Sequence, residues 1–140
     1  MTASKFRWRA AAILAICLAP LAGAQDFTIL VNQSMKVDSI SRIELRDVFT
    51  GESTSIHGVK VTPILLAGGL AHEALLRFLG TNAPAFAEMW RRQVFTGKGS
   101  MPRSVESEEA VIRFVGARHE AIGYVCWSKP AEGIKVLKVR

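Results

Sequence analysis

The chain has 140 residues, of which 49% are hydrophobic and 21% are charged, so an intrinsically disordered or low-complexity protein is excluded and one domain of ordinary size is expected. The formal net charge is +6, from 18 Lys and Arg residues against 12 Asp and Glu residues. No basic block or aromatic-basic stripe accompanies this excess, which argues against a nucleic-acid partner.

The first 24 residues have the features of a secretory signal peptide. Three basic residues precede an uncharged apolar stretch at 10–21, and Ala22-Gly23-Ala24 then offers a cleavage site before Gln25. The alternative is a membrane anchor, but the stretch is shorter than the roughly 20 residues that a spanning helix needs, and Pro20 interrupts it. We therefore predict a signal peptide at 1–24 and one periplasmic domain at 25–140, with no stable membrane span after cleavage.

The first half of this domain contains two predicted strands and a helix. Residues 27–31 are almost continuously apolar, which is typical of a buried central strand. Ser41 and Glu44 have the spacing of a capping box, so we expect a helix that begins there and ends near Gly51. A polar connection follows at 52–58. Residues 59–66 form the second predicted strand, in which Pro63 indicates an edge position or a bend.

Three more helices and two strands are predicted after residue 66. One helix opens at Gly68-Gly69 and ends at Gly80, a second is capped by Thr81 or Asn82, and a third is capped by Ser107. Residues 121–127 and 134–139 are the last predicted strands. The apolar faces of the later helices predict these core residues: Phe86, Met89, Trp90, Val94, Val111, Phe114 and Val115. The order of elements predicts an α/β fold with a mixed sheet, about four flanking helices and at least one strand-helix-strand crossover.

One short sequence occurs twice. Val48-Phe49-Thr50-Gly51 recurs as Val94-Phe95-Thr96-Gly97. We interpret this as two helices that end in the same way, each with an aromatic side chain in the core and a glycine in the left-handed conformation after the last turn. Two copies with different flanks do not indicate a repeat architecture.

Four segments together resemble the substrate-binding proteins of phosphate ABC transporters, the type II periplasmic binding protein class. In chain order these segments are Val31-Asn32-Gln33-Ser34, then Ile40-Ser41-Arg42-Ile43-Glu44-Leu45-Arg46-Asp47-Val48-Phe49-Thr50-Gly51, then Phe95-Thr96-Gly97-Lys98-Gly99 with Pro102, and Ile122-Gly123-Tyr124-Val125. The resemblance is to short, single-lobe members of the family. It implies a secreted, non-enzymatic domain that is related to one lobe of a phosphate-binding clamshell. Its implied partners are phosphate or another small oxyanion and an ABC transporter permease.

One segment departs from the family pattern. Family members hold the oxyanion at a helix start with a segment resembling R-x-x-x-S-G-T, because free N–H groups and hydroxyls meet there. The corresponding residues 65–71 read Leu-Leu-Ala-Gly-Gly-Leu-Ala, without the side chains that form the strongest bonds to phosphate. Most of the second lobe is also missing, although a clamshell gains affinity by closing two domains. The alternative function is therefore a ligand-free module that binds another envelope protein or itself.

The candidate ligand-binding residues are Ser34, Thr50, Gly68, Gly69, Gly97, Lys98 and Gly99. Gly68 and Gly69 would expose N–H donors to an anion, or they simply form a tight turn. Lys98 would add a positive charge beside free backbone donors, or it is a solvated turn lysine. Ser34 and Thr50 place hydroxyls at element ends, where capping is the alternative role.

The sequence contains no catalytic signature. The three histidines lack the spacing of metal ligands, and no G-x-S-x-G segment is present. The adjacent pair Glu108-Glu109 suits the positive end of a helix better than acid-base chemistry. We expect a protein that is not an enzyme and needs no metal or cofactor.

Overall fold

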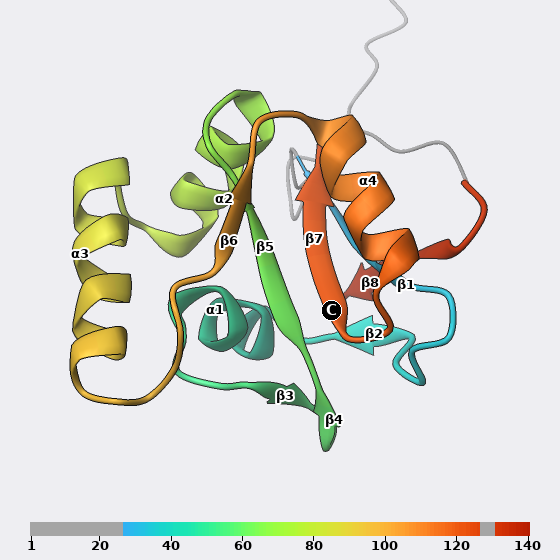
Figure 1. Ribbon diagram of the computed structural model, residues 1–140, viewed down its shortest axis with the longest axis horizontal. Coiled ribbons are helices and arrows are strands. Elements are labelled where there is room, and N and C mark those ends of the chain that lie inside the picture. Colours follow the sequence, from blue (N-terminus) through green and yellow to red (C-terminus); the bar gives the residue numbers. More distant parts are fainter. Residues whose placement is uncertain (1–26, 127–130) are drawn as a thin grey trace, which may run out of the picture.

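The computed structural model describes residues 27–126 and 131–140, so the predicted signal peptide and Trp127 lie outside the described residues. A six-stranded mixed sheet forms the centre of the fold (Figure 1). Its strands are β1 (Thr28–Asn32), β2 (Ser39–Ile40), β5 (Thr62–Leu66), β6 (Arg103–Val105), β7 (Ala121–Val125) and β8 (Ile134–Val139). A small hairpin consists of β3 (Ser55–Ile56) and β4 (Val59–Lys60). The helices are α1 (Arg42–Thr50), α2 (Leu70–Leu79), α3 (Ala83–Phe95) and α4 (Glu108–Ala117).

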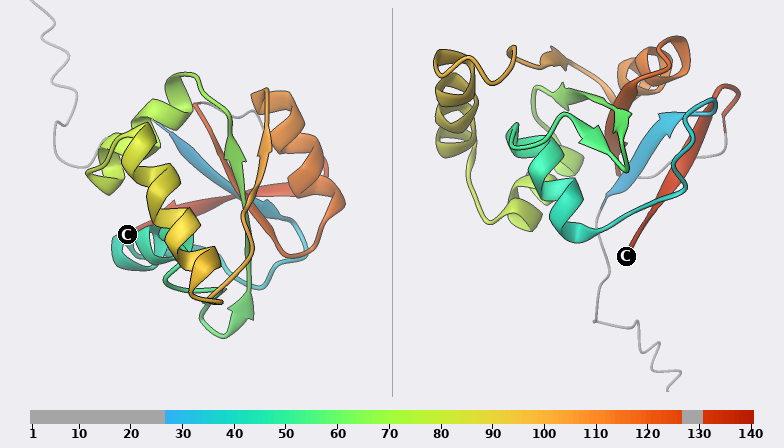
Figure 2. Two further views of the ribbon diagram at one scale, coloured as in Figure 1. Left: turned by 60° about the vertical axis from the view of Figure 1, so that its left-hand side comes forward. Right: turned by 90° about the horizontal axis from the view of Figure 1, so that it is seen from below.

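The strand order is β2-β8-β1-β7-β5-β6. Strand β1 pairs antiparallel with both of its neighbours, whereas β5 pairs parallel with β7 and β6. Two connections between parallel strands are crossovers. The connection β5-α2-α3-β6 leads from β5 outward to β6, and the connection β6-α4-β7 returns in the opposite direction, past β5 to β7. The helices of the two crossovers therefore cover opposite faces of the sheet, α4 on one face and α2 on the other, where α1 also lies (Figure 2). The predicted mixed α/β sheet with four helices is confirmed.

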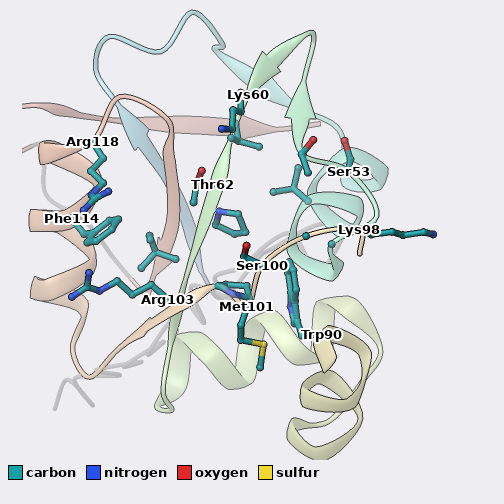
Figure 3. A pocket seen from close by; sticks show the side chains of 18 residues that line it. Ser53, Lys60, Thr62, Trp90, Lys98, Ser100, Met101, Arg103, Phe114 and Arg118 are labelled. Carbon is teal, nitrogen blue, oxygen red and sulfur yellow. The ribbon is translucent and has the colours of Figure 1, made fainter. Parts of the chain in front are cut away.

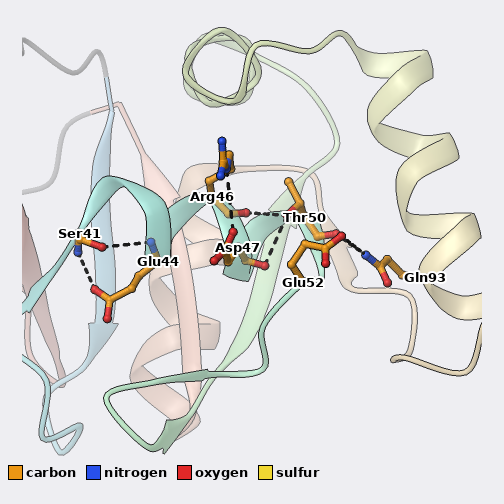
Figure 4. Close-up of polar contacts among 7 residues, drawn as sticks. All are labelled: Ser41, Glu44, Arg46, Asp47, Thr50, Glu52 and Gln93. Atoms are coloured by element: carbon orange, nitrogen blue, oxygen red, sulfur yellow. Dashed lines mark hydrogen bonds and ion pairs between the residues drawn. The ribbon is translucent and has the colours of Figure 1, made fainter.

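The predicted caps of α1 are confirmed. The Ser41 hydroxyl accepts the Glu44 N–H at 3.1 Å, and a Glu44 carboxylate oxygen accepts the Ser41 N–H at 2.8 Å (Figure 4). That hydrogen bond from the Ser41 backbone lowers the pKa of Glu44. Gly51 ends the helix at φ +81°, and a Cβ atom there would lie 2.9 Å from the Trp90 ring. The glycine therefore allows both the left-handed turn and the close approach of α3.

The repeated sequence has the same backbone but opposite burial in its two copies. Gly51 and Gly97 both have positive φ, at +81° and +74°. Phe49 is fully buried, whereas Phe95 is 92% exposed, so the prediction of a core aromatic is wrong for the second copy. The buried face of α3 includes Gln93, and two residues further on the helix has turned by about 200°, which points Phe95 away from the core.

Three predicted core residues of the later helices are also not buried, and one of them, Met89 of α3, is half-buried. Val94 is 41% exposed because it lies in the last turn of α3, beyond the part that packs on α1. Phe114 of α4 is half-buried, since its ring lies under two arginine side chains at the edge of the sheet.

The predicted strand at 59–66 is divided by Val61 into β4 and β5. Strand β5 is not an edge strand, because β6 lies outside it, and β6 is absent from the sequence prediction. Pro63 is compatible with this position because the β6 pairing begins only at Ile64. At Pro63, β5 is therefore paired with β7 alone and has an open side. A proline, which has no N–H to donate, is tolerated at such a position.

Strand β7 is buried along its whole length and is closely covered on both faces. On one face, a Cβ atom on Gly123 would lie 2.5 Å from Val111 Cγ1 and 3.2 Å from Val115 Cγ2 of α4. On the other face, the fully buried Tyr124 ring packs edge-on against Phe49 of α1. The expected close backbone contact at Gly123 is thus observed.

The Tyr124 hydroxyl connects three elements. Its oxygen accepts the Leu66 N–H of β5 at 2.8 Å and lies 2.6 Å from His72 Nδ1 of α2. Because the oxygen accepts the Leu66 N–H, the phenol proton is free to be donated to His72 Nδ1 when that nitrogen carries no proton. Burial of His72 lowers its pKa, and burial of Tyr124 raises the pKa of the phenol.

We predict that Gly123→Ala lowers the free energy of unfolding by about 1–3 kcal/mol, because the added methyl group overlaps Val111. Urea denaturation measures the change. Gly68→Ala is the control, since a Cβ atom there meets nothing within 4 Å. Equal stabilities of the two variants would show that α4 does not approach β7 this closely.

We also predict that the protein loses stability below pH 6.5, the ordinary pKa of histidine. The folded protein holds the pKa of His72 below that value, so the unfolded chain binds the proton more readily and the free energy of unfolding falls as the pH falls. His72→Asn keeps an acceptor but does not titrate. Its urea midpoint should therefore depend less steeply on pH than that of the wild type, and identical slopes would contradict the lowered pKa of the buried His72.

Candidate functional site

In open α/β sheets, ligands bind beyond the carboxyl ends of the strands, where successive crossovers change face. Here this place lies beyond β5 and β6, between the starts of α2 and α4. A hollow of about 390 Å³ is found there, and we call it the acidic hollow. Its lining residues are Leu66, Gly68, Gly69, Leu70, Ala71, Glu106, Ser107, Glu108 and Glu109. The described lining therefore includes three carboxylates and no basic side chain.

Neighbouring groups make the acidic hollow unfavourable for an anion. The first turn of α4 is capped internally, because the Ser107 hydroxyl accepts the Ala110 N–H at 3.1 Å. Glu108 accepts the Cys126 N–H at 2.6 Å, and Glu106 and Glu109 are exposed beside it. The start of α2 at Gly69 has no side-chain cap, yet three carboxylates oppose a phosphate in the same hollow.

A second hollow lies at the opposite, amino-terminal end of β5, and we call it the basic groove (Figure 3). Its volume is about 430 Å³. The polar residues that line it are Ser53, Thr54, Lys60, Thr62, Lys98, Ser100, Arg103 and Arg118. Four of them are basic, and no carboxylate is among the described lining residues. The groove therefore has the charge that the acidic hollow lacks.

Two arginines share one aromatic ring in the basic groove. Arg103 at the start of β6 and Arg118 after α4 place their guanidinium carbons 5.3 and 4.7 Å from the centroid of Phe114 (Figure 3). Stacking on a ring orients a guanidinium group while leaving its N–H donors available. Neither arginine forms an ion pair with a residue at 27–126 or 131–140.

The other wall of the groove is more apolar. Trp90 of α3 lines it, together with Met101 from the loop before β6. The Trp90 ring is held in place by its N–H, which donates to the Phe49 carbonyl at 3.1 Å. Glu52 lies in the chain between the lining residues Gly51 and Ser53, and its carboxylate accepts a hydrogen bond from Gln93 at 2.9 Å (Figure 4).

The segment at 97–99 lies partly in the groove. Gly99 and Lys98 line it, but the Lys98 side chain extends away from its centre (Figure 3). The N–H groups of Gly97 and Lys98 donate to the carbonyls of Val94 and Gln93 at 3.1 and 3.0 Å. These two amides therefore complete the end of α3, and they are not available for the expected anion nest.

Ser34 and Thr50 line neither hollow. The Ser34 hydroxyl lies 2.7 Å from both Asn32 Oδ1 and His119 Nδ1. Thr50 is 7% exposed, and its hydroxyl donates to the Arg46 carbonyl at 2.8 Å (Figure 4). Both hydroxyls are thus engaged within the chain, that of Thr50 with its own helix and that of Ser34 with Asn32 and the distant His119.

The seven candidate residues are not brought together at one place. Gly68 and Gly69 lie at the acidic hollow, whereas Lys98 and Gly99 lie at the basic groove. Sequence reasoning missed Lys60, Arg103 and Arg118, because they come from three separate segments that only the sheet and α4 bring close. Lys60 lies within the predicted strand at 59–66, Arg103 in the loop before the predicted helix capped by Ser107, and Arg118 after that helix.

The described residues show neither a metal centre nor a membrane helix. No group of three or more His, Cys, Asp or Glu side chains in these parts of the chain could hold a metal ion. None of the helices among them combines the length and apolar character needed to cross a membrane.

No family model matches the sequence, and no curated protein matches it. The fold is similar to that of three solved structures. One is described as a phosphate ABC transporter substrate-binding protein with bound phosphate from Clostridium perfringens, with 14% sequence identity and a TM-score of 0.63. The others are described as an ABC-type phosphate transport receptor from Vibrio cholerae (15% identity, TM-score 0.59) and a phosphate binding protein from Planctomyces limnophilus (13% identity, TM-score 0.57). Each match covers 81% of this chain, but only 44%, 45% and 41% of the respective neighbours. The expected single-lobe fold of the periplasmic binding protein type is therefore confirmed.

Proposed function

We propose that this chain is an exported, non-catalytic binding domain that takes a small oxyanion, with phosphate as the first candidate, in the basic groove. One observation carries the proposal: Lys60, Arg103 and Arg118 line the groove without a carboxylate among the described lining residues. Two of the similar solved structures are a phosphate ABC transporter substrate-binding protein with bound phosphate and an ABC-type phosphate transport receptor, which supports phosphate as the ligand to test first.

The groove offers suitable chemistry for an oxyanion. Arg103 and Arg118 can each present two parallel N–H donors, the geometry that matches phosphate and carboxylate oxygens. The hydroxyls of Thr62 and Ser100 add neutral donors on the same lining, and Lys60 adds a mobile positive charge. Because the groove opens to water, its affinity should fall as salt screens these charges.

The cellular role follows from export. The signal peptide at 1–24 would deliver the domain to the periplasm, where a bound oxyanion could be passed to an ABC transporter permease. A second candidate function is a module that binds another envelope protein or itself. It is favoured by apolar side chains exposed near the groove, Phe95 at 92% and Met101 at 54%.

We predict saturable binding when the exported protein is titrated with phosphate or sulfate in a calorimeter at low salt. Arg103→Gln with Arg118→Gln should weaken binding at least tenfold, since a hydrogen bond to a charged group contributes about 1.5–3 kcal/mol. Lys138→Gln removes one charge on β8, outside the groove, and should have little effect.

Three results would count against the groove. Absence of saturable heat would exclude a small oxyanion and favour the interaction module. An equal loss of affinity in the Lys138→Gln control would indicate general charge attraction. A change caused by Glu106→Gln with Glu109→Gln, but not by the arginine variants, would place the anion at the acidic hollow.

We predict that the exported protein begins at Gln25. Mass spectrometry of protein purified from the periplasm of a bacterial host measures its N-terminus. Ala24→Lys should leave the precursor uncleaved, because the cleavage site requires small residues. A mature protein that still contains residues 1–24 would contradict the signal peptide.

A further inference from the structure

The two hollows have opposite charge and lie at opposite ends of the same two strands. Strand β5 runs from Thr62, in the basic groove, to Leu66, in the acidic hollow. Strand β6 runs beside it from Arg103 to Val105, and Glu106 follows directly. One end of this strand pair is thus positive and the other end is negative.

The charged side chains at both ends are exposed and available to a partner. Glu106 and Glu109 at the rim of the acidic hollow are exposed, as are Lys60, Arg103 and Arg118 at the groove. None of the five forms an ion pair with another described residue. Isolated surface charges of this kind contribute little within the chain, but they determine which surfaces attract each other.

Exposed apolar side chains accompany the charges at each end. Leu70 lines the acidic hollow and is 75% exposed. Met101 lines the basic groove and is 54% exposed, and Phe95, at 92%, ends the helix that leads into this segment. A single exposed apolar residue is ordinary, but large apolar side chains beside opposite charges are typical of interaction surfaces.

We propose that the rim of the acidic hollow of one copy docks in the basic groove of a second copy, so that the chain assembles head to tail. The rim supplies Glu106, Glu109 and Leu70, and the groove supplies the arginines and the apolar wall with Met101. Because the two surfaces lie at opposite ends of β5, each docked copy still presents one unused surface. Such a heterologous contact continues until a ring closes, or it forms an open chain.

This inference goes beyond oxyanion binding, although the same groove is used. An oxyanion bound between Arg103 and Arg118 occupies the position of the partner's carboxylates. Phosphate should therefore dissociate the assembly more strongly than chloride at equal ionic strength, if both proposals hold.

The first test is the mass of the exported protein in analytical ultracentrifugation. At about 0.01 M salt, where charges act over about 30 Å, we expect a mass of at least twice that of the monomer. At about 1 M salt, where charges act over only about 3 Å, we expect the monomer mass. A wild-type monomer at low salt and high micromolar concentration would overturn the proposal.

The second test uses two neutral variants. The groove variant carries Arg103→Gln and Arg118→Gln, and the rim variant carries Glu106→Gln and Glu109→Gln. Each variant alone should be monomeric, because every contact needs one groove and one rim, and each variant has lost one of these two surfaces. An equimolar mixture should form a heterodimer and nothing larger, because only one pair of intact surfaces remains.

A control variant and three possible results decide whether the chain assembles head to tail. Lys138→Gln should assemble like the wild type, since β8 lies outside both surfaces. Assembly of either double variant alone, or a mixture that stays monomeric, would overturn head-to-tail docking. Phosphate binding by a protein that is always monomeric would refute this inference alone, whereas assembly without phosphate binding would refute only the proposed ligand.

Discussion

The arrangement of the whole molecule depends on the close covering of β7 from both sides. Gly123 lets α4 approach one face to within contact of the strand backbone, and Tyr124 fixes the other face by joining Leu66 and His72 through its hydroxyl. These neighbouring residues hold α4 and α2 on opposite faces of the sheet. The starts of the two helices meet beyond the carboxyl ends of β5 and β6. The acidic hollow is the space left between these two helix starts, whereas the basic groove is bounded by α3, the loop at 98–102 and the hairpin.

The charge of each hollow depends on the length of β6. This strand has only three residues, so Arg103 at its start and Glu106 just after its end belong to different ends of the sheet. A periodic strand places alternate residues on opposite faces, but here the change of charge runs along the strand axis. The usual ligand position of an open α/β sheet is thereby acidic, and the positive charge lies where such sheets seldom hold a ligand.

Local signals predicted the elements, whereas non-local contacts decided the site. Ser41, Asn82 and Ser107 all cap helices as the sequence indicates, because capping involves residues only three positions apart. Strand β6 was missed because its three residues carry no apolar pattern and exist as a strand only through pairing with β5. For the same reason Arg103 and Arg118 could not be assigned to a common groove, and the exposure of Phe95 could not be read from a sequence that it shares with the buried Phe49.

Both outer strands of the six-stranded sheet are very short, two residues in β2 and three in β6. An outer strand offers unpaired backbone groups to any other chain, and short outer strands with charged side chains limit that offer. Sheets of two molecules therefore have little opportunity to fuse edge to edge into amyloid-like ladders. Contacts between copies must instead be made by side chains, which salt or a small ligand can reverse.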